Sequence, residues 1–290
     1  MVKFTVIGGN ASKDLAKRIA RRLKAPYVET QTKIFPDGES KITLGYISKN
    51  SIILVVQSTY PPVDTNLLQA LSIISQARKI SSRIYAIIPY MGYARQDKQF
   101  LSGEVVTMTV VSKMLQVAGA KKVFVVDIHS KTALNHFKIP SENISAIPEL
   151  AKYFKKLKLK NSLVVSPDIG GSLRAKKFAS LLNTGFITLK KSRNRNTGKV
   201  RVMSSKVDVH GKNLILVDDI ISTGSSIIKA TQFLKKQKCK RVFVACTHGL
   251  FVGDAESKIK KAGVAQIIST NTIPRGTSKV DISGVIAESI

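Results

Sequence analysis

The sequence contains the stretch Leu214-Ile215-Leu216-Val217-Asp218-Asp219-Ile220-Ile221-Ser222-Thr223-Gly224-Ser225-Ser226. An unbroken apolar run is typical of a strand covered on both faces of a parallel sheet, and we expect this strand over 213–217. The two acids would then lie at its carboxyl end, where open α/β sheets bind their ligands. The small residues that follow can present backbone N–H groups to a phosphate at the start of a helix. A plainer interpretation is that Asp218 and Asp219 only cap a turn.

Outward from this stretch, short β-branched runs alternate with helical patterns, which predicts βαβ units and a mostly parallel sheet. We predict strands over 3–7, 51–57, 83–88, 122–127, 162–166, 185–189, 213–217, 241–246 and 265–269. We predict helices near 12–24, 64–80, 104–118, 147–156, 171–182, 225–237 and 254–262. The length suits either two medium domains or one large α/β domain. An internal repeat favours two, and Pro140 and Pro148 flank a polar stretch that suits a boundary, so we expect α/β domains over 1–144 and 145–290.

A short internal repeat supports two related halves. Lys121-Lys122-Val123-Phe124-Val125 leads to His129, and Lys240-Arg241-Val242-Phe243-Val244 leads to His248, at an offset of 119 residues. Each copy follows a helical pattern, a loop and another buried strand. This repeat indicates an internal duplication.

Charge narrows the class of ligand. The 290 residues include 47 Lys+Arg and 18 Asp+Glu, with 20 basic and 10 acidic residues in 1–150 and 27 and 8 in 151–290. Such an excess favours polyanions, either nucleic acid or phosphorylated metabolites. The sequence lacks an apolar run of membrane-spanning length and a signal peptide, and its two cysteines have no metal-ligand spacing. We therefore expect a cytoplasmic protein without a membrane partner.

Several motifs carry a resemblance to a known family. The stretch 214–226 resembles the phosphoribosyl-diphosphate loop shared by phosphoribosyltransferases and phosphoribosyl-diphosphate synthases. Other segments resemble the synthases alone and follow the family's order. They are Phe35-Pro36-Asp37-Gly38-Glu39, Gln57-Ser58-Thr59, 88–97, Asp127-Ile128-His129, 165–171, Cys246-Thr247-His248 and 270–273. Over nearly its whole length, the chain thus resembles the ribose-phosphate pyrophosphokinase family.

The resemblance implies a fold and a reaction. It implies two phosphoribosyltransferase-like α/β domains with central, mostly parallel sheets and the active site between them. It also implies a transferase of nucleotide biosynthesis that uses Mg²⁺ and moves the β,γ-pyrophosphoryl group of ATP to the C1 hydroxyl of D-ribose 5-phosphate. The products would be 5-phospho-α-D-ribose 1-diphosphate and AMP. A phosphoribosyltransferase would explain 214–226 alone, and a non-catalytic regulatory homologue would suit the basic surface; we expect no specific nucleic-acid partner.

The resemblance also implies roles for the individual residues that match the family's motifs. The expected ATP-binding residues are Phe35, Asp37, Gly38, Glu39, Arg95, Gln96 and His129. In the family the segment 35–39 reaches a neighbouring subunit's site, which implies at least a homodimer. The expected metal ligands are His129 and Asp168, and the expected catalytic residues are Lys191 and Arg193, within the family's K-x-R loop. The expected ribose 5-phosphate-binding residues are Arg193, Asp218, Asp219, Ser222, Thr223, Gly224, Ser225 and Ser226.

Two departures from the family pattern bear on function. Ser222 stands where the synthases commonly have a third acid, although its hydroxyl can still bind phosphate. In regulated relatives, a basic-Ser-Arg cluster after the 88–97 motif binds phosphate and ADP, but here Leu101 and Gly103 replace its basic residues. We therefore expect no strong phosphate activation and no allosteric ADP inhibition.

Overall fold

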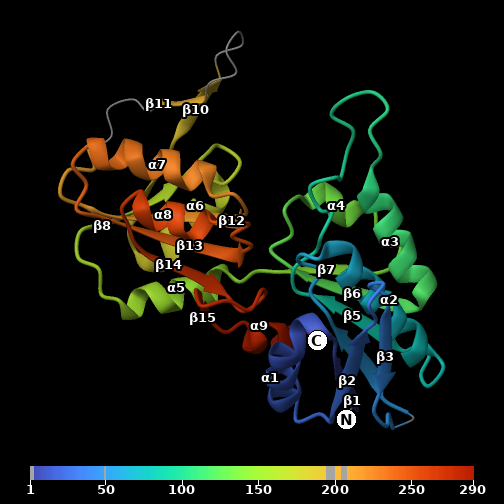
Figure 1. Cartoon of the computed structure of the whole chain (residues 1–290). Coiled ribbons are helices and arrows are strands. Elements are labelled where there is room, and N and C mark those ends of the chain that lie inside the picture. The colour runs from blue at the N-terminus through green and yellow to red at the C-terminus, as the bar shows by residue number, and fades with distance from the viewer. Residues whose placement is uncertain (1–2, 49, 194–199, 204–207) are drawn as a thin grey trace. The chain divides into compact units, whose positions relative to one another are not determined.

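A computed structural model describes residues 3–48, 50–193, 200–203 and 208–290, with the backbone alone for 190–193 and 200–203. The chain forms two compact units. The first comprises Met1–Ser145, Thr272–Pro274 and Ile282–Ile290, and the second comprises Ala146–Asn271 and Arg275–Asp281. Each unit is an α/β structure around its own sheet, so both sheets of the predicted fold class are present (Figure 1).

Among its described residues, the first unit has a seven-stranded sheet in the order β3-β2-β1-β4-β5-β6-β7. The strands are β1 (Phe4–Gly8), β2 (Tyr27–Ile34), β3 (Ser40–Leu44), β4 (Ile52–Val56), β5 (Ile84–Ile88), β6 (Ala120–Val126) and β7 (Ser141–Ile144). The helices are α1 (Lys13–Leu23), α2 (Val63–Arg78), α3 (Thr107–Ala118), α4 (Lys131–Asn135) and α9 (Ser283–Glu288), with a 3₁₀ turn η1 (Asn10–Ser12). Neighbouring strands are parallel except β2 and β3, which form an antiparallel hairpin.

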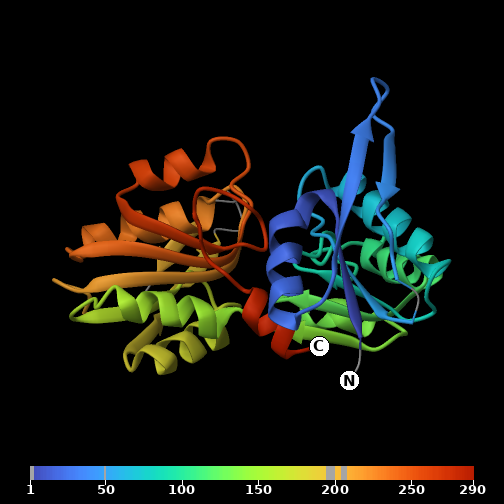
Figure 2. The same cartoon turned by 90° about the horizontal axis from the view of Figure 1, so that it is seen from below.

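The first sheet is covered on both faces because the chain leaves its centre in two directions. The crossover from β1 to β2 and the crossover from β4 to β5 run opposite ways, and right-handed connections place α1 and α2 on opposite faces. Figure 2 shows α1 and α9 on one side of the sheet and α2 and α3 on the other. Ile53, Val55 and Ile84 are buried in the core that α2 and α3 cover.

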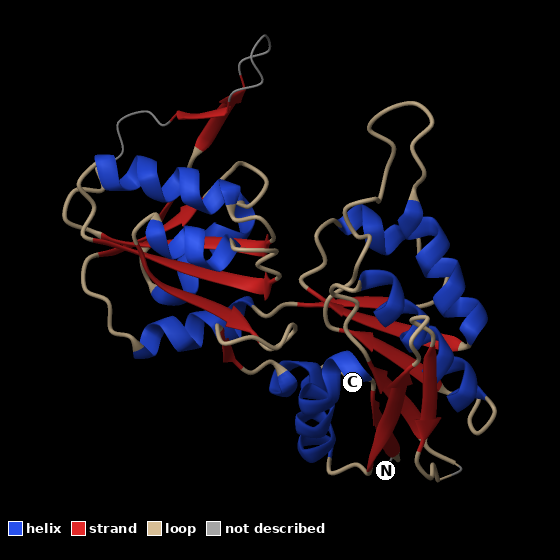
Figure 3. Cartoon of the chain, viewed as in Figure 1, coloured by secondary structure: helices blue, strands red, loops and turns tan. Residues whose placement is uncertain are grey.

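Among its described residues, the second unit has a six-stranded parallel sheet in the order β15-β14-β13-β12-β8-β9. The strands are β8 (Ser162–Ser166), β9 (Gly185–Thr188), β12 (Asn213–Ile221), β13 (Arg241–Gly249), β14 (Val264–Thr270) and β15 (Ser278–Val280). The helices are α5 (Ile147–Lys156), α6 (Ser172–Leu182), α7 (Ser225–Lys236) and α8 (Ala255–Lys261). A separate antiparallel pair joins β10 (Lys190–Arg193) to β11 (Val200–Met203), as Figure 3 shows.

The apolar run of β12 is buried on both faces, as its sequence predicts. Leu214 and Leu216 belong to a core cluster with side chains of α7 and α8. Ile215 and Val217 alternate with them and belong to a second cluster, with side chains of α5 and α6. This double burial fixes the register of β12, because a shift by one residue would exchange the two sets.

The two sheets correspond strand by strand. The order β2-β1-β4-β5-β6-β7 in the first unit matches β9-β8-β12-β13-β14-β15 in the second, and the hairpin strand β3 and the pair β10–β11 occupy the same place in chain order. The sequence repeat at an offset of 119 residues nevertheless aligned strands that are not equivalent. It aligns β6 with β13, whereas the strand order pairs β6 with β14 and β5 with β13. Buried parallel strands have similar compositions, so a five-residue match does not identify equivalent strands.

Candidate active site

The two acids lie at the switch point of the second sheet. The connection after β8 leads to β9, and the connection after β12 leads in the opposite direction to β13. In open α/β sheets, ligands bind at the carboxyl ends of two neighbouring strands whose connections run opposite ways. Asp168 follows β8, and Asp218 and Asp219 lie on β12. The predicted end of this strand at 217 was wrong, because β13 continues to Gly249 and keeps β12 paired as far as Ile221.

Arg174 on α6 bridges the two acids and was absent from the predicted site. Its Nη1 atom lies 3.5 Å from Oδ1 of Asp218, and its Nη2 atom lies 3.4 Å from Oδ1 of Asp219. The side chain of Asp219 is 7% exposed, and those of Arg174 and Asp218 are 20% and 18% exposed. An ion pair with so little solvent contact is screened far less than a surface pair.

Ionisation of the neighbouring carboxyl groups of Asp218 and Asp219 is unfavourable in this site. Burial raises the pKa of Asp218 well above its ordinary value, and the charge of Asp219 beside it and that of Asp168 raise this pKa further. Arg174 acts in the opposite sense and lowers the pKa. The site therefore holds three carboxyl groups near one guanidinium group, which suits hydrogen-bond donors or cations as ligands.

A glycine turn orients Asp168. The backbone N–H of Gly171 donates to Oδ1 of Asp168 over 3.1 Å, and the hydroxyl of Ser166 donates to the carbonyl oxygen of Asp168 over 2.6 Å. A Cβ atom at position 171 would lie 2.7 Å from Oγ of Ser166 and 3.4 Å from Nη1 of Arg174. Glycine at this position therefore leaves room for both the turn and the guanidinium group.

The small-residue turn after β12 leads directly into α7. Gly224 precedes the first residue of this helix and has φ +73°, a left-handed conformation that favours glycine. Thr223 and Ser225 are exposed, and Ser222 and Ser226 are partly buried. The N-cap residue Gly224 has no side chain that could cap this end of α7, where the helix dipole and backbone N–H groups attract anions. The arrangement suits a phosphate group.

The chemistry of the acidic site fits a magnesium ion with few protein ligands. Within the part of the chain that the structure describes, no three His, Cys, Asp or Glu side chains are grouped closely enough to hold a metal by themselves. Mg²⁺ commonly keeps several water molecules and binds one or two carboxylates together with substrate phosphates. The partly buried carboxylate of Asp168 can serve as such a ligand.

The candidate adenine-binding residues form the turn of the β2–β3 hairpin. The N–H of Phe35 donates to the carbonyl oxygen of Glu39 over 2.8 Å, and Gly38 turns the chain with φ +92°. Asp37 and Glu39 are exposed and Phe35 is partly exposed, with Nζ of Lys33 5.3 Å from the centre of its ring. Figure 2 shows this hairpin extending beyond the rest of its sheet.

Arg95, Gln96 and His129 lie beyond the carboxyl ends of neighbouring strands in the first unit. Arg95 and Gln96 follow β5, and His129 lies between β6 and α4; all three are exposed. Because β5 and β6 are paired in parallel, both segments leave the sheet at the same edge. The two metal-ligand candidates belong to different units, His129 to the first and Asp168 to the second.

The Gln57-Ser58-Thr59 motif is buried and fills the switch point of the first sheet, between β1 and β4. Oε1 of Gln57 accepts from the N–H of Ala11 over 3.0 Å, and a Cβ atom on Gly9 would lie 2.2 Å from it. The hydroxyl of Ser58 donates to the carbonyl oxygen of Thr272 over 2.6 Å. At the place where the second unit has an acidic site, the first unit therefore has a hydrogen-bonded core.

For the candidate catalytic residues Lys191 and Arg193, the structure describes the backbone alone. The backbone of Lys191 pairs with Val202 and that of Arg193 with Val200, so the start of the predicted loop is strand β10. The side chains of both residues, and all of 194–199, lie outside the described part of the chain.

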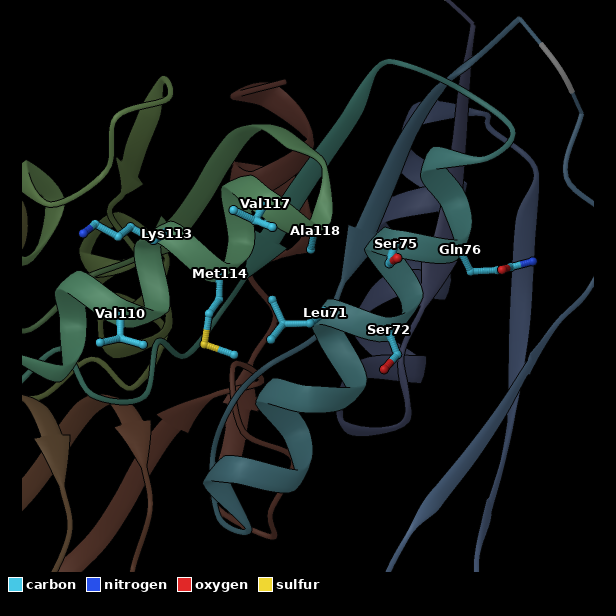
Figure 4. Close-up of a pocket in the computed structure, with 9 residues that line it drawn as sticks. All are labelled: Leu71, Ser72, Ser75, Gln76, Val110, Lys113, Met114, Val117 and Ala118. Atoms are coloured by element: carbon cyan, nitrogen blue, oxygen red, sulfur yellow. The ribbon is translucent and has the colours of Figure 1, made fainter.

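An apolar groove of about 750 Å³ lies between α2 and α3, and none of the candidate residues lines it (Figure 4). Its lining residues are Leu71, Ser72, Ser75, Gln76, Val110, Lys113, Met114, Val117 and Ala118. With a single charged residue among them, this groove does not suit a phosphorylated substrate. Among the described residues, no helix has the length and apolar character that crossing a bilayer requires.

Comparison with known proteins gives one consistent result. Residues 4–119 match the sequence model of the N-terminal domain of ribose phosphate pyrophosphokinase, and 194–290 match that of the phosphoribosyl synthetase-associated domain. The chain is 36% identical to the ribose-phosphate pyrophosphokinase of Sulfurisphaera tokodaii, over 98% of this chain and 99% of that protein. The chain belongs to the ribose-phosphate pyrophosphokinase family of enzymes.

A second curated relative and a solved structure match the chain over nearly its whole length. The Pasteurella multocida ribose-phosphate pyrophosphokinase is 36% identical, with 100% of this chain and 96% of that protein covered. The crystal structure of phosphoribosylpyrophosphate synthetase from Mycobacterium smegmatis is 29% identical and has a TM-score of 0.86, covering 99% of this chain and 97% of that one. The family resemblance read from the motifs is thus confirmed over the full length.

Proposed function

We propose that this enzyme transfers the β,γ-pyrophosphoryl group of ATP to the C1 hydroxyl of D-ribose 5-phosphate, giving 5-phospho-α-D-ribose 1-diphosphate and AMP. The observation that carries the proposal is the junction of β12 and α7. There, paired carboxylates lie next to a small-residue turn at a helix N-terminus, at the switch point of a parallel sheet. A sugar phosphate offers hydroxyl donors at one end and an anion at the other, which are the two features this junction can bind.

In this proposal, Asp218 and Asp219 accept hydrogen bonds from the vicinal ribose hydroxyls. Ser222, Thr223, Gly224, Ser225 and Ser226 bind the 5-phosphate through backbone N–H groups and hydroxyls. Arg193 supplies a further cation to the sugar phosphate. The exposure of Thr223 and Ser225 supports the phosphate assignment, because residues at the surface can contact a ligand without rearrangement of the core.

ATP is the proposed donor substrate. Phe35 stacks on adenine, and Asp37, Gly38 and Glu39 bind its polar edge, in a site completed by a second copy of the chain. The exposure of the hairpin turn supports this assignment, since it leaves these side chains available to a neighbouring subunit. Arg95, Gln96 and His129 are proposed to bind the rest of ATP, and an arginine suits phosphate oxygens.

The reaction is an in-line displacement at the β-phosphorus. The C1 oxygen of ribose forms a bond to this phosphorus while the bond to the α–β bridging oxygen breaks, and AMP leaves with that oxygen. The hydroxyl proton passes to solvent. Lys191 and Arg193 stabilise the charge that develops on the transferring group and on AMP. Mg²⁺ is the proposed cofactor, with Asp168 and His129 as protein ligands, and when bound it would offset phosphate charge.

Product identification tests the proposal. The protein is incubated with ATP, ribose 5-phosphate and Mg²⁺, and nucleotides are separated by ion-exchange chromatography. We expect equal amounts of AMP and 5-phosphoribosyl 1-diphosphate, and none when ribose 5-phosphate is omitted. ADP as the product would indicate an ordinary kinase. A phosphoribosyltransferase would instead release pyrophosphate from 5-phosphoribosyl 1-diphosphate and a nucleobase, and a regulatory homologue would form no product.

A further inference from the structure

Arg174 lies in the first turn of α6, directly after the turn that orients Asp168. Its two terminal nitrogens lie near two different carboxylates, at 3.5 Å from Oδ1 of Asp218 and 3.4 Å from Oδ1 of Asp219. The planar guanidinium fork fits such a bridge, whereas the single nitrogen of a lysine reaches one carboxylate at a time. The absence of a side chain at Gly171 leaves space beside Nη1.

The two acids need a group that holds them together. Neighbouring carboxylates with little solvent contact repel each other, and either one can relieve the repulsion by turning away or by taking up a proton. A rotated or protonated carboxyl group accepts fewer hydrogen bonds from a pair of sugar hydroxyls. Asp219 is 5% exposed as a whole residue, so solvent cannot replace the guanidinium group there.

We propose that Arg174 is a positioning residue, whose guanidinium group holds Asp218 and Asp219 in the arrangement that accepts the vicinal hydroxyls of ribose 5-phosphate. This role rests on the proposed function, because it assigns the sugar to the same two acids. In this role Arg174 acts by bridging the two carboxylates and does not itself contact the substrate. ATP binding is therefore expected to be independent of Arg174.

The test compares Arg174→Met and Arg174→Lys with the wild type, using Lys176→Met as a control for an exposed cation on the same helix. Ribose 5-phosphate affinity is measured by calorimetry without ATP, and both Michaelis constants are measured in the complete reaction. We expect Arg174→Met to weaken ribose 5-phosphate binding about 10- to 100-fold, the usual effect of losing charge-assisted hydrogen bonds. The KM for ATP of Arg174→Met should remain close to the wild-type value. The control Lys176→Met should keep its KM for ATP and its melting temperature close to wild type.

The lysine variant and a double mutant separate positioning from direct contact. Because lysine cannot bridge, Arg174→Lys should recover only a small part of the loss; near-wild-type affinity would show a simple phosphate contact and overturn the role. In an Asp218→Asn background, Arg174→Met should weaken binding less than about 3-fold, whereas fully additive losses would contradict coupling. Wild-type protein that fails to bind ribose 5-phosphate overturns the proposed function as well, while wild-type-like binding by Arg174→Met overturns positioning alone.

Discussion

The backbone N–H of Asp219 donates a hydrogen bond to Oδ1 of Asp218 over 2.9 Å, so the second acid of the pair holds the first through its own main chain. The same oxygen is the one that Arg174 approaches. These contacts keep two like charges adjacent in a site with little solvent, at a cost in stability that a bound sugar or cation would relieve.

Asp218→Asn should therefore stabilise the protein without substrates while it impairs catalysis. We expect the free energy of unfolding at pH 7 to rise by about 0.5–2 kcal/mol, as is common when an unfavourable charge is removed. Ribose 5-phosphate use should fall sharply, with the KM for ATP nearly unchanged. Denaturant unfolding and steady-state kinetics measure the two effects.

The pH dependence follows from the raised pKa of Asp218. At pH values below the ordinary aspartate pKa, both the folded and unfolded forms are protonated and there is no penalty. As the pH rises toward the raised pKa, the unfolded form ionises first and stability is lost. The advantage of Asp218→Asn should thus shrink as the pH is lowered from 7 toward 4. Asp208 has a pKa lowered by Lys212, so Asp208→Asn should not stabilise; equal stabilisation by both would contradict this origin.

Gly224→Ala should destabilise the second unit and weaken ribose 5-phosphate binding. The residue has φ +73°, and a Cβ atom would lie 2.7 Å from Cδ1 of the buried Ile259. Strain and overpacking together should cost about 2–3 kcal/mol. Gly211 has a similar φ of +67° but open space around it, so Gly211→Ala should cost about 1–2 kcal/mol. Urea unfolding compares them, and a smaller loss for Gly224→Ala would exclude the steric term.

Lys191→Ala should lower kcat far more than it changes either Michaelis constant. A cation that acts on the transition state selectively contributes to kcat, typically by 10²- to 10⁴-fold. Steady-state kinetics with both substrates varied give the measurement. Lys190→Ala, one residue away on the same strand, is the control. A Lys191→Ala variant that keeps more than about half of the wild-type kcat would remove this residue from the mechanism.

Phosphate should not be required for activity, and ADP should compete simply with ATP. In the segment where a basic cluster is missing, the N–H groups of Phe100 and Leu101 donate to Oε2 of Glu104, at 2.8 and 3.1 Å. An internal carboxylate thus already accepts from two backbone donors of this segment. Titration of phosphate and ADP at saturating substrates is the measurement. ADP inhibition that excess ATP does not relieve would show a separate anion site.

The sequence predicted the elements with strong periodicity and missed those without it. All nine predicted strands are present, and β8 and α5 agree with their predicted ranges to the residue. β10 is polar, and β11, β15 and α9 have only four, three and six residues, so neither pattern nor length distinguished them. β2 was missed although its residues alternate in burial, because its second half carries polar side chains on an exposed hairpin.

The site was predictable where chemistry is carried by neighbouring residues. Asp218, Asp219 and the turn up to Ser226 lie within one short stretch, so the sequence alone indicates a phosphate and hydroxyl site. Arg174 is 44 residues from Asp218, and an arginine on a helix carries no signal of its partners. The burial of Gln57, Ser58 and Thr59 was not predicted, since polar side chains at the end of a strand carry no sequence signal of burial.

The most direct test of the central claim uses ATP labelled with ¹⁸O in the α–β bridge, together with ribose 5-phosphate and Mg²⁺. Attack of the C1 hydroxyl on the β-phosphorus breaks the bond between that phosphorus and the bridging oxygen. We therefore predict that mass spectrometry finds the label in AMP and that 5-phosphoribosyl 1-diphosphate is unlabelled. Label in free pyrophosphate would show attack at the α-phosphorus, and label retained in ADP would show transfer of the γ-phosphoryl group; either result would contradict the account.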